Sequence, residues 1–225
     1  MSEQTTPRRR RRRTDADRSA EAILRAATEI LAAQPNASVE EIAGGAGVSR
    51  QTVYAHFKSR DALVSAVIDA ITGEAVAAME AAALDDGPAV DALLRLLDVS
   101  WRTIQRYPLL LGALTAGAAA VDSDRDTEAQ ARARADETRH EPVNDHLDRV
   151  LRRGQESGEF THDLPTAWLA TAVVALGHAA GGEVATGRMT LQDAADALAR
   201  SVLRLCGVGP STITGVLDRA ARREH

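Results

Sequence analysis

The fold of this chain is decided by residues 38–63, which read SVEEIAGGAGVSRQTVYAHFKSRDAL. The first four residues have the form S-x-x-E, in which the Ser38 hydroxyl accepts from the Glu41 amide and the Glu41 carboxylate reaches back to the Ser38 amide. A short helix therefore begins at this point, and Gly47 can end it in the left-handed conformation that costs a residue with a Cβ. Ser49 can then cap a second short helix over 50–57. Two short helices joined by so tight a turn predict a helix-turn-helix.

The helix over 50–57 presents a polar side that suits DNA. Val53 and Phe57 are expected to be buried, and the displayed residues are Arg50, Gln51, Thr52, Tyr54, Ala55 and His56. The second helix of a helix-turn-helix enters the major groove, where arginine pairs with guanine and glutamine with adenine. A thymine methyl can meet a small residue, here Thr52 or Ala55.

Other donors in this stretch are predicted to hold phosphates, which set the register without reading bases. They are Ser38, Ser49, Tyr54, His56, Lys58 and Arg60, together with the helix N-termini at the two serines. Taken singly, each serine could be a cap only and each polar residue a solvated surface group. Their combination at this spacing favours contact with DNA.

Further helices are predicted on both sides of this stretch. Ile23, Ala27 and Leu31 belong to an apolar stripe over 17–33, and another stripe runs from 59 or 60 to about 83. Residues 1–15 are dense in arginine without periodicity, which predicts a disordered arm that either touches DNA or is only solvated. We expect an arm over 1–15, a helix-turn-helix domain over 16–62, a helical ligand-binding and dimerisation domain over 63–207, and a tail over 208–225.

The composition supports an all-α chain. Prolines number seven and aromatic residues make up 3%, while alanine, leucine and arginine, all good helix formers, are abundant. The pattern predicts body helices near 89–106, 108–120, 124–157, 164–185 and 190–207, with Pro142 kinking or splitting the third. The last fifteen residues form one more short helix or fray.

Charge and cysteine content narrow the class of protein. Residues 1–60 carry a net charge of +4 and the remainder −9, which suits phosphate contact at one end of the chain. The single cysteine, Cys206, forms no internal disulfide and indicates no metal site or oxidising compartment. The arginine run is not followed by an apolar segment, and the apolar stretch 164–184 is interrupted by His178, Glu183 and three glycines. We expect a cytoplasmic protein with no membrane span.

Residues 23–27 (ILRAA), 38–43 (SVEEIA) and 47–63 (GVSRQTVYAHFKSRDAL) resemble the DNA-binding domain of the tetracycline-repressor (TetR) family. The resemblance implies base-facing roles for Arg50, Gln51, Thr52 and Ala55, and phosphate-facing roles for Ser38, Tyr54, His56 and Lys58 or Arg60. It also implies an Ω-shaped homodimer whose eighth and ninth helices form a four-helix interface. Repression would end when a ligand in the body moves the recognition helices apart. Gly44-Gly45 and the arginine run depart from the family pattern.

Two rows of residues, here called seams, on the helices predicted over 164–185 and 190–207 favour a dimer independently of the family resemblance. Their residues recur at spacings of four and three along Trp168, Ala172, Ala175, Ala179 and Gly182, and along Leu191, Ala195, Leu198, Val202 and Leu205. The small residues of the first seam permit close approach of a partner helix. Packing within one subunit is the alternative for either seam.

A ligand pocket is also expected in the domain over 63–207. Its candidates are the large or polar-tipped residues Trp101, Tyr107, His146, Trp168, His178 and Met189, although each such residue taken singly is more often core or surface than a ligand contact. His140, His146 and His162 lack a compelling metal-ligand spacing, so no metal or other cofactor is expected. No G-x-S-x-G, phosphate-binding loop or H-E-x-x-H occurs, which argues against an enzyme. The expected partners are double-stranded DNA, a second copy of the chain and an unidentified small molecule; a ligand-independent or activating regulator stays open.

Overall fold

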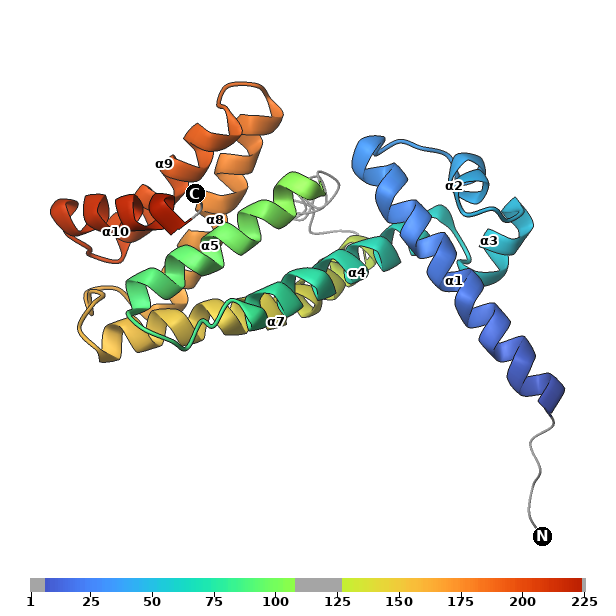
Figure 1. Cartoon of the computed structure of the whole chain (residues 1–225), viewed down its shortest axis with the longest axis horizontal. Coiled ribbons are helices and arrows are strands. Elements are labelled where there is room, and N and C mark those ends of the chain that lie inside the picture. Colours follow the sequence, from blue (N-terminus) through green and yellow to red (C-terminus); the bar gives the residue numbers. More distant parts are fainter. Residues whose placement is uncertain (1–6, 108–126, 224–225) are drawn as a thin grey trace, which may run out of the picture. The chain divides into compact units, whose positions relative to one another are not determined.

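The structure is a computed structural model that describes residues 7–107 and 127–223. Every regular element in this part of the chain is a helix (Figure 1), which confirms the all-α prediction. In chain order these are α1 (Pro7–Ala33), α2 (Val39–Gly45), α3 (Arg50–His56), α4 (Arg60–Ala81), α5 (Ala89–Arg106), α7 (Thr127–Glu156), α8 (Thr166–Ala185), α9 (Leu191–Leu205) and α10 (Pro210–Arg223). The helix predicted over 108–120 lies outside the described residues.

The chain divides into two compact units, Met1–Ile71 and Thr72–His225. The sequence predicts the boundary after residue 62, at the start of α4, whereas the division falls inside this helix. The first part of α4 belongs to the first unit because its side chains Leu63 and Val67 are buried there.

The first unit is a small helical domain with one core. Its fully buried side chains come from all four of its helices and are Ile23, Ala27, Leu31, Ile42, Val53, Leu63 and Val67. Helix α1 begins at Pro7, so an irregular arm is wrong for residues 7–15. Proline is favoured at the first helical position, and arginine extends a helix readily.

The second unit is a bundle in which α5 lies between α7 and α9 (Figure 1), while α8 packs on both α7 and α9. Leu93, Leu151 and Leu203 are among the side chains at the centre of its core. Helix α7 continues through Pro142 without splitting, although proline removes one amide donor. Burial of Leu151 and its neighbours on α7 offsets that loss.

Residues 210–223 form a regular helix, α10, so this part of the tail predicted over 208–225 is a structured element of the second unit. Ile213 and Val216 are buried in the core, and Leu217 packs against it at the helical spacing of three and four. These apolar side chains hold α10 in place because they pack on the core of the second unit.

Among the described helices, α4 alone has the length and apolar composition of a membrane span. Five of its apolar side chains recur every four residues and are buried in the protein: Leu63, Val67, Ile71, Ala75 and Met79. This one-sided burial is typical of a helix that packs on a protein core.

Candidate nucleic-acid interface

Helix α2 begins with the capping box that the sequence predicts. The Ser38 amide donates to Glu41 Oε2 at 2.7 Å, and the Glu41 amide donates to Ser38 Oγ at 3.2 Å. These bonds lower the pKa of Glu41, the bond from the Ser38 amide most. The box fixes where α2 starts and so where the turn after it must lie.

The Gly44-Gly45 pair that departs from the family pattern has two different environments. A Cβ at Gly45 would lie 2.6 Å from Ile30 Cδ1 on α1, whereas a Cβ at Gly44 would meet nothing within 4 Å. Gly45 therefore allows α1 and α2 to approach closely. No contact in the structure requires glycine at position 44.

The turn between α2 and α3 is set by one glycine and one serine. Gly47 has φ +67°, which confirms the predicted left-handed residue. Ser49 Oγ then accepts from the Thr52 amide at 3.1 Å and lies 2.8 Å from Thr52 Oγ1. Because the two hydroxyls bond each other, the exposed start of α3 is held in one conformation.

Helix α3 is buried on one side and open on the other. Val53 is 1% exposed and anchors the helix to the first unit, while Phe57, at its C-cap, is half-buried. The residues predicted to meet DNA occupy the open side: Arg50, Gln51, Tyr54 and Ala55 are exposed, and Thr52 and His56 are half-buried. The structure thus gathers the predicted base-facing residues on one accessible helix face.

Arg50 makes contacts that the sequence did not reveal. Its Nη1 lies 2.5 Å from Glu40 Oε1 on α2, and its guanidinium carbon lies 5.3 Å from the centre of the Tyr54 ring. The Tyr54 side chain, followed by the Glu40 carboxylate, raises the pKa of Arg50. The Glu40 carboxylate, ten positions earlier in the chain, therefore holds the Arg50 guanidinium over the ring of Tyr54. No local pattern indicates Glu40, since the pairing depends on how α2 packs beside α3.

The two cations that follow α3 differ in their surroundings. Arg60 Nη2 donates to Pro35 O at 3.0 Å and to Ala37 O at 3.3 Å, so this side chain holds the turn between α1 and α2. Lys58 is exposed. Of the two, Lys58 has its ammonium available for a phosphate, and the guanidinium of Arg60 is already engaged.

The residues predicted to line a ligand pocket do not share one cavity. Trp101 is buried and lines a cavity in the second unit, but none of the other predicted residues does so there. The Tyr107 hydroxyl donates to Glu74 Oε2 at 2.8 Å, and His146 Nδ1 lies 2.6 Å from Arg149 Nη2. Trp168 is 57% exposed, and His178 is half-buried on α8.

The two predicted dimer seams behave differently. Trp168, Ala175 and Ala179 on α8 are exposed, with Ala172 and Gly182 half-buried beside them. On α9 the seam is wrong at Leu198 and Val202, which are 7% and 0% exposed and belong to the core of their own unit. Leu191 is exposed, and Ala195 and Leu205 are half-buried. A four-and-three spacing describes any long apolar stripe, and on α9 that stripe covers the subunit core.

Metal ligands do not gather in the part of the chain whose side chains are described. Within residues 18–107 and 141–222 no group of three or more His, Cys, Asp or Glu could hold a metal ion. His140 lies outside this part of the chain.

The sequence of the first unit is similar to known DNA-binding regulators. The model of the family described as bacterial regulatory proteins, tetR family, matches residues 23–67. Over 79 residues the chain is 40% identical to the HTH-type transcriptional repressor LfrR of Mycolicibacterium smegmatis. That stretch covers 35% of this chain and 41% of LfrR, so less than half of the relative is matched.

Solved structures extend the likeness in fold to both units. A TetR-family transcriptional regulator from Rhodococcus sp. is 22% identical, with a TM-score of 0.66 over 84% of this chain and 98% of that chain. LfrR from Mycobacterium smegmatis, solved in complex with proflavine, is 27% identical, with a TM-score of 0.60 over 85% of this chain and 97% of that chain. Residues 23–67 thus carry the helix-turn-helix that the model of the tetR family of bacterial regulatory proteins describes, and both units are similar in fold to solved regulators of that family.

Proposed function

We propose that this regulator is a cytoplasmic transcriptional repressor that binds a pseudo-palindromic operator as a homodimer and is released by a small molecule. The observation that carries the proposal is the open face of α3, where Arg50, Gln51 and Tyr54 are exposed above the buried Val53. A rigid capped helix with such a face is suited to the major groove.

Reading of bases is assigned to the start of α3. Arg50 donates two hydrogen bonds to guanine and Gln51 pairs with adenine, while Ala55 meets a thymine methyl. Arg50 exchanges its Glu40 partner for the base on binding. Tyr54, His56 and Lys58 hold the phosphates on either side.

Support for the homodimer comes from α8. A helix that is apolar on all sides is normally covered on all sides. Helix α8 buries Leu169 and Val173 in its own unit, yet it leaves Trp168 57% and Val174 37% exposed. A second copy of the chain would cover this face, and two copies would set two α3 helices about 34–36 Å apart on successive major grooves.

The oligomeric state can be tested by placing a charge on that face. Ala175 and Ala78 are both exposed, on α8 and α4 respectively. We expect Ala175→Arg to give monomers in analytical ultracentrifugation and Ala78→Arg to leave the dimer intact. Dimers that survive Ala175→Arg at all concentrations would place the interface elsewhere.

Support for small-molecule release comes from a relative. LfrR, 27% identical over 85% of this chain, was solved in complex with proflavine. A protein of the same fold therefore accepts a small organic ligand, and a ligand that favours one conformation shifts the population away from DNA.

The first experiment is selection of bound duplexes from a random library at fixed salt, followed by titration of the enriched and a scrambled duplex. We expect an inverted repeat. Arg50→Ala should lose much of the preference for the repeat, with a smaller effect on scrambled DNA. Arg222→Ala, an exposed arginine on α10, is the charge-matched control and should leave the preference unchanged.

The outcome decides between two roles for Arg50. Equal losses of affinity on both duplexes would show that Arg50 supplies only charge. No enriched sequence from protein purified through a refolding step, which removes any carried-over ligand, would count against sequence-specific regulation altogether.

A further inference from the structure

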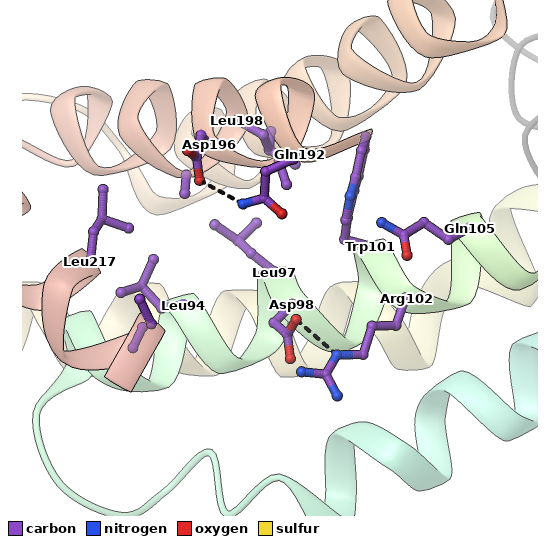
Figure 2. A pocket seen from close by; sticks show the side chains of 14 residues that line it. Leu94, Leu97, Asp98, Trp101, Arg102, Gln105, Gln192, Asp196, Leu198 and Leu217 are labelled. Carbon is purple, nitrogen blue, oxygen red and sulfur yellow. Dashed lines mark hydrogen bonds and ion pairs between the residues drawn. The ribbon is translucent and has the colours of Figure 1, made fainter. Parts of the chain in front are cut away.

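The second unit contains a cavity of about 650 Å³ between α5, α9 and α10. Figure 2 shows leucines from these three helices, Leu94 and Leu97 on α5, Leu198 on α9 and Leu217 on α10, around it. A volume of this size is typical of sites for small organic molecules. Helix α10 closes one wall, so the cavity depends on the C-terminal segment of the chain.

An unsatisfied donor lies in the wall. Trp101 is 5% exposed, and its Nε1 is buried without a hydrogen-bond partner. Figure 2 shows the indole extending from α5 toward α9 at the edge of the cavity. Buried polar groups nearly always have partners, because an unpaired one forfeits its bond to water. An acceptor atom placed in the cavity would supply the missing partner.

The wall also carries a carboxylate, Asp196, to which no described residue supplies an ion pair. Asp98 is paired with Arg102, whose Nε lies 2.9 Å from its Oδ1. Asp196 accepts from the Gln192 amide at 3.3 Å, and no ion pair to it occurs in the described part of the chain. With two carboxylates and one guanidinium among its lining residues, the cavity has a net negative charge.

We propose that this cavity binds an organic monocation with a flat apolar body and a hydrogen-bond acceptor. The body lies between the leucines, the cationic amine faces Asp196, and the acceptor receives a hydrogen bond from Trp101 Nε1. An anion would meet the carboxylates, and a purely apolar molecule would leave the indole donor unpaired. The proposal rests on the proposed function only in making this ligand the signal that releases DNA.

Isothermal titration of the full-length protein with quinine, in the absence of DNA, tests the site. Quinine carries a protonated amine and a quinoline nitrogen that can accept. Cinchophen, a quinoline carboxylate, is the anionic counterpart. We expect quinine to bind at one site per chain and cinchophen to bind much more weakly or give no heat.

Three variants locate the binding. Asp196→Asn removes the charge and Trp101→Phe removes the donor while keeping a ring, and each should weaken quinine about tenfold, the loss expected for one charge-assisted or buried bond. Asp145→Asn, an exposed carboxylate on α7 outside the cavity, is the matched control and should bind as the unaltered protein does. Circular dichroism establishes that each variant is folded.

The results separate this proposal from the proposed function. Quinine that binds both variants as tightly as the unaltered protein, or that shows a Kd above about 1 mM, overturns the site. Site-specific binding that leaves operator affinity unchanged supports the site and overturns its role in release. If the protein binds its operator but does not bind quinine, the cavity assignment is refuted and the DNA-reading role is unaffected.

Discussion

The N-terminus of α5 is capped by a residue from a distant part of the chain, and the strength of this cap can be measured. Glu159 Oε1 accepts from the Ala89 amide at 3.0 Å, and Oε2 accepts from the Val90 amide at 3.1 Å. Pro88, at the N-cap position, provides no side-chain cap. Glu159 therefore satisfies two amides that a helix end leaves without partners.

Removal of this carboxylate should be costly. Loss of an N-cap costs about 1 kcal/mol, and hydrogen bonds to a charged group contribute about 1.5–3 kcal/mol each. Water can reach the half-buried site and can accept from the two freed amides, which offsets part of the lost stabilisation. We therefore expect Glu159→Ala to lower the free energy of unfolding by about 2–3 kcal/mol. The Arg153 nitrogens are buried without hydrogen-bond partners, and loss of the nearby negative charge adds to the effect.

The assay is urea unfolding followed by tryptophan fluorescence. Both tryptophans, Trp101 and Trp168, lie in the second unit, so the signal reports the unit that contains α5. Glu159→Gln keeps one acceptor and should cost about half as much as Glu159→Ala. Glu156→Gln, an exposed carboxylate at the end of α7, is the control and should stay within about 0.5 kcal/mol of the unaltered protein.

The effect should depend on pH in a definite direction. Burial raises the pKa of Glu159, but the bonds from Ala89, Val90 and Ser157 and the charge of Arg153 outweigh it, and the net pKa lies below 4.5. The stabilisation is thus complete above that ordinary value and disappears as the pH falls through the folded-state pKa. A Glu159→Ala loss under about 1 kcal/mol at neutral pH, or one that persists unchanged in acid, would refute the capping role.

Four further predictions concern single residues. Gly154→Ala places a Cβ against the buried Phe160 ring and should lower the free energy of unfolding of the second unit, measured in urea, by about 1–3 kcal/mol. Gly44→Ala places its Cβ in open space and should stabilise α2 by up to about 1 kcal/mol. Burial raises the pKa of Cys206 to about 12, so mass spectrometry after iodoacetamide treatment at neutral pH should detect no adduct until the protein unfolds; rapid labelling of the native protein would contradict this. Ser38→Ala removes the capping box and should cost the first unit about 1 kcal/mol by thermal unfolding, and no change would mean that α2 is held by packing alone.

The local features of the DNA-binding unit could be predicted from sequence. Ser38 and Glu41 form the expected capping box, Gly47 takes the expected left-handed conformation, and Ser49 caps α3. Each of these interactions joins residues no more than about four positions apart, so the local pattern contains both partners. The exposed side of α3 follows from the same short-range periodicity.

The contacts between distant residues were decided only by the tertiary structure. Glu40 reaches Arg50, Arg60 reaches the turn before α2, and Glu159 caps a helix that begins 70 residues earlier. The stripe on α9 shows the limit most clearly, since its spacing suits a partner subunit as well as its own core and the packing of Leu198 selects the core. Periodicity states which residues share a helix face, but only the arrangement of the helices in space determines what that face covers.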